Sequence, residues 1–171
     1  MIGPGGMPSA ETGVLHAQVI KAHILEQVVP TANAWTDFSN FTVVADETNG
    51  DSLALNADTK TIEISREGLY QFGGCIHYID GGGAGFSDLI VLSRIFINGT
   101  DEARCSQRGK DQNLRASGEE VLSYNGTAYL NAGDTLTLQY YTNKANLRFF
   151  SNALFDAPVA ATIWLIYVGT Y

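Results

Sequence analysis

The chain has 171 residues, of which 10 are Lys or Arg and 18 are Asp or Glu, so its formal net charge is −8 at pH 7. This acidic balance excludes the basic face with which nucleic-acid-binding proteins neutralise phosphates. No run approaches the roughly 20 apolar residues of a transmembrane helix, so no membrane insertion is expected. Hydrophobic residues make up 45% of the chain and charged residues 16%, a composition that indicates cover of some apolar surface by another subunit.

Residues 1–30 are expected to form an N-terminal arm. Residues 1–12 are rich in Gly, Pro and Ser and lack the basic and apolar regions of a secretory signal. In the segment 14–29, apolar residues recur at helical spacings but β-branched residues are frequent, so both helix and strand stay open. The segment is too short for a solitary helix, and we expect it to pack on a partner or to form one third of a three-chain stalk.

From Trp35 onward the pattern is one of strands and turns. Apolar or alternating runs occupy 37–45, 61–65, 69–79, 89–97, 120–130, 135–141, 146–150 and 159–168. The pairs Asn98-Gly99 and Asn125-Gly126 are predicted as hairpin turns, because both central residues of a type I′ turn need a positive φ. About eight strands at this spacing predict an all-β sandwich or jelly roll.

Two runs bear on subunit contacts. The run 69–79 alternates between an apolar face and a small or polar face, which indicates a half-buried strand. The last run, 159–168, is apolar on both faces, so both of its sides need cover. One side can face the core, and a second copy of the chain is the simplest cover for the other. The alternative is cover by the chain's own segment 14–29. The candidate interface residues are Tyr70, Phe72, Trp164, Ile166 and Tyr167.

Several of these runs also carry a family resemblance. Ile62 followed by GLYQF at 68–72 resembles the C1q-domain signature, although many members have Phe in place of this Ile. The stretch LNAGDTLTL at 130–138 resembles the turn and strand of that family, and IWLIY at 163–167 resembles its last strand. The stretch RIFINGT at 94–100 resembles a strand and turn of C1q-like domains in bacteriophage virion proteins.

The resemblance covers residues 31–171 and implies a C1q/TNF-like jelly roll that assembles as a homotrimer. The chain lacks the collagen repeat usual beside animal C1q domains. It is therefore more similar to a bacteriophage structural protein, such as a head fibre, spike or tail-fibre tip, located in the virion. Residues 1–30 would then attach it to capsid or tail proteins. The alternative is a non-viral, extracellular C1q-like domain that recognises a ligand, with or without calcium.

The residues give no motif for catalysis. Neither Gly-x-Ser-x-Gly nor a histidine cluster with metal-ligand spacing is present, and the adjacent Glu119 and Glu120 would point to opposite faces of a strand. We therefore expect no enzyme activity, no cofactor and no metal. Calcium remains an alternative at Asp46, Glu47 and Asp51, whose oxygens suit that ion, although three acids in a turn are usually just solvated.

A basic segment interrupts the acidic chain. Arg104, Arg108, Lys110 and Arg115 lie within twelve positions of a polar stretch. Such a segment on a rigid β scaffold could bind an anionic partner, such as a host cell-surface glycan or an acidic capsid surface. The plainer interpretation is that these charges pair with neighbouring acids.

The cysteines and histidines give weaker signals. Cys75 and Cys105 are expected to be free thiols, with a disulfide as the alternative. His16 and His23 would share a face if the segment 14–29 were helical, whereas His77 lies on the polar face of its strand and is expected at an interface or against a loop.

Overall fold

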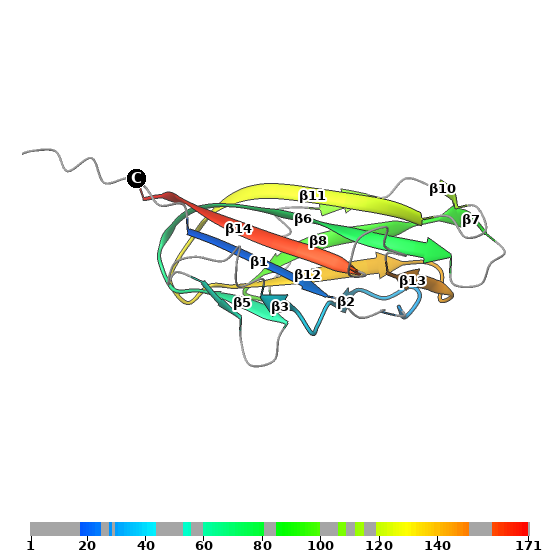
Figure 1. Ribbon diagram of the computed structural model, residues 1–171, viewed down its shortest axis with the longest axis horizontal. Helices are drawn as coiled ribbons and strands as arrows, with labels where there is room; N and C mark the ends of the chain where they lie inside the picture. The colour runs from blue at the N-terminus through cyan, green and yellow to red at the C-terminus, as the bar shows by residue number, and fades with distance from the viewer. Residues whose placement is uncertain are drawn as a thin grey trace, which may run out of the picture.

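The chain folds as an all-β sandwich, which confirms the predicted fold class (Figure 1). The computed structural model describes residues 18–24, 28, 30–43, 53–55, 60–80, 85–99, 106–108, 112–114, 119–150 and 159–170. All regular elements within these residues are strands, and every pairing between them is antiparallel. These described residues contain no helix that is long and apolar enough to cross a bilayer.

The first sheet contains the longest strands. Its order is β11 (Glu119–Leu130), β6 (Gly68–Asp80), β14 (Ala161–Gly169), β1 (Gln18–Ile24) and β3 (Thr42–Val43), and β13 (Leu147–Phe149) also pairs with β6. Figure 1 shows β11, β6, β14 and β1 side by side along the long axis of the molecule.

The second sheet packs against the first. Its order is β4 (Leu53–Leu55), β5 (Thr61–Ile64), β12 (Thr135–Thr142), β8 (Val91–Ile97) and β9 (Ser106–Arg108), and β2 (Thr36–Asp37) also pairs with β12. A separate small pair is formed by β10 (Gln112–Leu114) and β7 (Phe86–Leu89).

The core between the sheets is built from the inward side chains of the long strands. In β14 the burial alternates through Ile163 and Leu165, as expected for a strand with one face inside. Phe38 and Phe149 complete an aromatic cluster with Tyr140, with ring centroids 4.5–5.4 Å apart in tilted or edge-on geometry. These rings connect the first sheet to the loop between β2 and β3.

The segment left open between helix and strand is a strand where it is described. β1 pairs with β14 from Gln18 opposite Tyr167 to Ile24 opposite Ala161. It lies in the plane of the first sheet, so it extends that sheet and does not cover its face. His23 therefore lies on a strand and not on the helix that would have given it a common face with His16. His16 lies outside the described residues. The first strand of the jelly roll thus precedes the expected boundary at residue 30.

The two Asn-Gly turn predictions have opposite outcomes. Asn98 and Gly99 have φ of 54° and 65°, which confirms the turn after β8. The prediction for Asn125 and Gly126 was wrong, because both residues lie inside β11, opposite Gly73 and Phe72 of β6. Long-range pairing along the whole of β11 outweighs the local turn preference of the dipeptide.

The expected run 37–45 is also interrupted. β2 ends at Asp37 and β3 begins at Thr42. Asn40, between them, has a φ of 64°, which breaks the extended backbone. Phe38 and Phe41 are both buried in the core, so the break lets two aromatic rings enter it from one short loop.

Candidate functional site

An apolar surface lies on the side of the first sheet that faces away from the core. We call it the outer β6 face, and it consists of Val121 and Tyr129 of β11, Leu69 of β6, and Trp164, Ile166 and Val168 of β14. Val121 is 49% exposed, Tyr129 43% and Val168 41%. The other large apolar side chain that the described residues leave exposed is Trp35, which precedes β2 and contacts Tyr141 of the second sheet. Five of the six residues lie toward the Leu69 end of β6, and Val121 lies opposite His77 at the other end. Grouped apolar residues of this kind mark interaction surfaces.

The register explains how these residues come together. Tyr129 is directly opposite Leu69, and Trp164 is directly opposite Gly73 across β6 and β14. Directly paired residues point to the same face of an antiparallel sheet, and alternate residues along each strand do so as well. The apolar outer face is therefore a product of three strands that are far apart in the sequence.

The structure divides the five predicted interface residues between the two faces. Trp164 and Ile166 are half-buried on the outer β6 face. Tyr70, Phe72 and Tyr167 point into the core and are at most 5% exposed, which corrects their assignment to subunit contacts. Odd and even positions of a strand point to opposite sides, so Tyr167 cannot share a face with Ile166.

The inward tyrosines have partners within the chain. The rings of Tyr70 and Tyr167 lie 5.3 Å apart in edge-on geometry. The Tyr70 hydroxyl donates a 2.6 Å hydrogen bond to the carbonyl oxygen of Arg66. Their bulk therefore stabilises the single chain.

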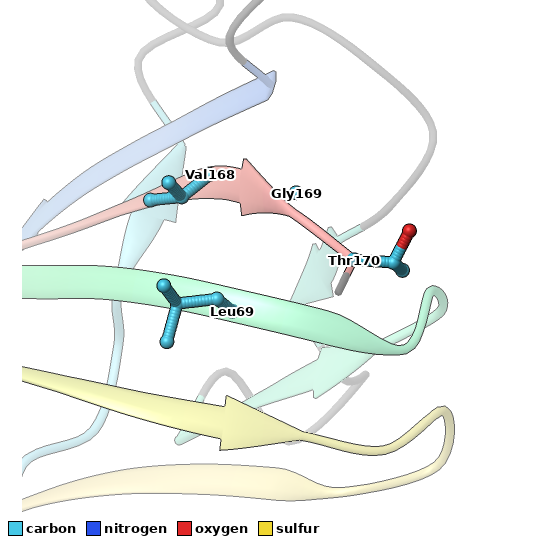
Figure 2. Close-up of a pocket in the computed structure, with 4 residues that line it drawn as sticks. All are labelled: Leu69, Val168, Gly169 and Thr170. Carbon is cyan, nitrogen blue, oxygen red and sulfur yellow. The ribbon is translucent and has the colours of Figure 1, made fainter.

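Two hollows indent the outer β6 face. One, of about 340 Å³, is lined by side chains that include Gln71, Asn125, Thr127 and Trp164. The other, of about 130 Å³, lies where Leu69 of β6 and Val168 of β14 approach the strand ends (Figure 2). The face is thus uneven, with polar side chains in the larger hollow and apolar ones in the smaller, a shape that a complementary side chain can fill.

A polar group lies on the same face, toward the other end of β6. The Sγ atom of Cys75 is 3.3 Å from Nε2 of His77 and 3.2 Å from Oγ1 of Thr162. Nδ1 of His77 is 3.8 Å from Oε1 of Glu119, too far for a hydrogen bond, although close enough for electrostatic attraction. Burial lowers the pKa of His77, and the nearby Glu119 carboxylate only partly offsets that effect.

The second sheet carries a different surface, which the sequence did not indicate. The guanidinium of Arg94 lies between two rings, 4.0 Å from the centroid of Trp35 and 4.3 Å from that of Phe96. Its Nε donates a 2.7 Å hydrogen bond to Gln139, whose Nε2 in turn donates to Asp37 at 2.7 Å. We call these five residues the Arg94 cluster. Only the alternation of Arg94 and Phe96 along β8 was visible in the sequence, because Trp35 and Gln139 come from distant segments.

Most of the basic segment lies outside the described residues. Arg104, Lys110 and Arg115 are not described, and Arg108 is the last residue of β9, opposite Leu92 of β8. Arg108 therefore lies at the edge of the second sheet. Glu119, a neighbouring acid that follows this segment, lies beside His77.

The residues of the alternative calcium site and one of the two cysteines also lie outside the described residues. Asp46, Glu47 and Asp51 lie outside the described residues. In the part of the chain that the structure describes, no three His, Cys, Asp or Glu side chains are close enough together to hold a metal ion. Cys75 is a free thiol, and Cys105 is not described.

Comparison with known proteins identifies the fold. No protein-family model matches the chain, and no curated protein matches it. Murine APRIL is similar in structure, with a TM-score of 0.57 at 13% identity over 89% of this chain and 99% of that one. The Eiger TNF of S. frugiperda is similar too, with a TM-score of 0.57 at 12% identity over 91% of this chain and 94% of that one. Likeness at such identities shows the fold alone, and the chain has a TNF-like jelly roll.

Proposed function

We propose that this protein is a non-catalytic adhesion or structural protein that self-associates as a homotrimer through its outer β6 face. The observation that carries the proposal is that Val121, Tyr129 and Val168, each more than 40% exposed, all lie on the outer side of one sheet, Tyr129 and Val168 beside Leu69 and Val121 at the other end of β11. A second copy that covers such a surface releases the water in contact with it. This burial stabilises the assembly by roughly 25 cal/mol for each Å² of apolar area. The trimer that the C1q/TNF resemblance implies agrees with this use of the face.

The opposite sheet then faces away from the threefold axis. The Arg94 cluster on that sheet is already ordered by stacking and by two hydrogen bonds. Preordered aromatic and Arg side chains lose little conformational entropy when a partner binds, so they are typical of recognition surfaces. The basic residues 104–115 and this cluster are the candidate sites for a host cell-surface glycan or another partner.

For the setting of this trimer we propose the virion of a bacteriophage, as a head fibre, spike or tail-fibre tip. The support is the resemblance of residues 94–100 to C1q-like domains of phage virion proteins. Capsid or tail proteins would hold the N-terminal segment. A non-viral, extracellular ligand-recognition domain is the second candidate, and the TNF-like fold favours it because solved structures of that fold include murine APRIL and Eiger TNF.

Sedimentation equilibrium at micromolar concentration tests the trimer. The wild-type chain is expected at three times the monomer mass. The double variant Val121→Lys/Val168→Lys is expected at the monomer mass, because the trimer would have to bury six lysine charges and lose their hydration free energy. Trp35→Lys is the matched control, since it places the same charge on a comparably exposed apolar residue of the other sheet. A wild-type monomer, or dissociation by Trp35→Lys alone, contradicts the proposal.

Mass spectrometry of purified particles, with antibody labelling, tests the virion setting. Attachment is best probed by deleting residues 1–12, because a deletion through residue 30 would remove β1 and with it the partner of β14. We expect the shortened chain to remain trimeric and to be lost from particles. Retention on particles would contradict the proposed role of the N-terminal segment.

A further inference from the structure

The polar end of the outer β6 face combines a thiol, an imidazole and a carboxylate. Cys75 and His77 are alternate residues of β6 and therefore point to the same side of the sheet. Thr162 is opposite Cys75 on β14, and Val121, two residues after Glu119 on β11, is opposite His77. Three strands thus bring together groups from residues 75, 77, 119 and 162.

Two contacts with Thr162 position the backbone and the sulfur of Cys75. Oγ1 of Thr162 accepts a 3.0 Å hydrogen bond from the backbone N–H of Cys75. The same oxygen lies 3.2 Å from Sγ of Cys75, a contact in which either group can be the donor. The contacts with Thr162 hold the sulfur on the outer β6 face. Deprotonated sulfur is the form of cysteine that binds metals.

The imidazole is oriented in a complementary way. Glu119 lies on the Nδ1 side of His77, so Nε2 is the nitrogen directed toward the sulfur. A metal-binding imidazole usually donates its other ring N–H to a carboxylate, which fixes the ring and its tautomer. Glu119 lies 3.8 Å from Nδ1, so a movement of less than an ångström would complete this hydrogen bond.

The spacing of the two donors suits one metal ion. With Zn–S near 2.3 Å and Zn–N near 2.0–2.1 Å in a tetrahedral site, sulfur and nitrogen lie about 3.5–3.6 Å apart. The observed separation of Sγ and Nε2 is 3.3 Å, so a movement of a few tenths of an ångström would admit the ion.

We propose that Cys75 and His77 form a chelating pair for a soft divalent metal ion such as Zn²⁺. The pair supplies two ligands, and both side chains lie on the outer β6 face. The remaining positions are therefore filled from outside the chain, by water on a single copy and by another copy in the assembly. That last part rests on the proposed self-association, whereas the chelating pair itself rests on the geometry of one chain.

Nucleophilic catalysis by the same pair is less well supported. A cysteine nucleophile needs N–H donors for the oxyanion that it creates, and the backbone N–H of Cys75 is already donated to Thr162. Neither of the two hollows described on this face is lined by Cys75 or His77. The group is better suited to hold an ion than to turn over a substrate.

Titration of the full-length, reduced protein with Co²⁺ tests the proposal, because thiolate coordination produces a near-ultraviolet charge-transfer band. We expect the band in the wild type, saturating at no more than one ion per chain and displaced by Zn²⁺. Cys75→Ser should abolish the band. His77→Gln should weaken binding at least tenfold, and Glu119→Gln about tenfold with the band retained. Cys105→Ser, which removes the other thiol, is the matched control and should bind like the wild type.

The mass of each sample, measured together with the spectrum, separates the two proposals. A trimeric wild type without the band overturns the metal site and leaves self-association intact. A monomeric wild type with the band overturns self-association and upholds the chelating pair. A band that survives Cys75→Ser but disappears in Cys105→Ser would show that Cys105 supplies the thiolate. That result also overturns the metal site at Cys75 and His77. Circular dichroism spectra of each variant confirm that a lost band reflects lost ligands and not an unfolded chain.

Discussion

Gly73 controls the position of Trp164 on the outer β6 face. A Cβ atom built on Gly73 would lie 2.6 Å from Cζ2 of Trp164 and 2.7 Å from the backbone oxygen of Tyr124. Ordinary van der Waals contacts begin at 3.4 Å, so the indole would have to give way by about 0.8 Å. The contact with Tyr124 is to backbone, so the spacing of β6 and β11 would change as well. Gly73→Ala is therefore expected to displace Trp164 and to loosen both strand pairings.

The magnitude follows from these two contacts. Inserting a methyl group into a well-packed site costs about 1–3 kcal/mol, and involvement of a neighbouring backbone places Gly73→Ala in the upper half of that range. Replacing glycine also restricts the unfolded chain, which offsets about 0.5–1 kcal/mol. The net loss is about 2 kcal/mol, which corresponds to a fall in Tm of about 4–8 °C for a domain of this size.

Thermal unfolding followed by circular dichroism measures this loss, with all samples at one protein concentration because self-association stabilises the folded state. Trp164→Leu removes the indole, so the double variant with Gly73→Ala should lose less stability than the two single losses added together, with a coupling of about 1 kcal/mol. Unchanged stability of Gly73→Ala, or strict additivity in the double variant, would refute the steric reasoning.

Three further predictions concern other parts of the fold. Burial raises the pKa of Tyr140 above 10.0, so its stabilising effect is fully present below about pH 10 and is lost as the pH rises through the folded pKa; Tyr140→Phe should reduce the alkaline loss of stability in urea titrations at successive pH values, and an unchanged pH profile contradicts this assignment. Gly99→Ala should cost about 1 kcal/mol in denaturant unfolding, because Gly99 has a φ of 65°; a neutral or stabilising effect would show that the turn relaxes. Arg94→Lys should cost about 1 kcal/mol and increase acrylamide quenching of Trp35 fluorescence, since the planar stacked cation is lost; quenching equal to that of the wild type would show that the stack does not order the ring.

Strand patterning in the sequence predicted much of the first sheet. The alternation of apolar residues placed a half-buried strand at 69–79 and a strand apolar on both sides at 159–168, and both became central strands, β6 and β14. Periodicity of two assigns residues to two sides, but it does not say which side faces inward. It does separate Tyr167 from Ile166, so a subunit contact that includes both is wrong, and the chain buries Tyr167 against Tyr70.

Local turn chemistry was reliable only where no strand competed with it. Asn98-Gly99 forms the expected turn at the end of β8. Asn125-Gly126 has the same composition but lies within β11, because pairing with β6 on both sides of the dipeptide holds it extended. A two-residue preference of about 1 kcal/mol does not outweigh a ladder that spans the whole strand.

The sequence by itself determined that the chain is acidic, all-β and apolar on both sides of its last strand, because composition and periodicity are properties of the chain in order. Only the tertiary structure decided that β1 belongs to the sheet, that Tyr129 and Val168 come together beside Leu69, and that Thr162 and Glu119 flank Cys75 and His77. Each of these juxtapositions joins strands far apart in the sequence. Their register is set by the packing of the whole sandwich, which no local pattern encodes.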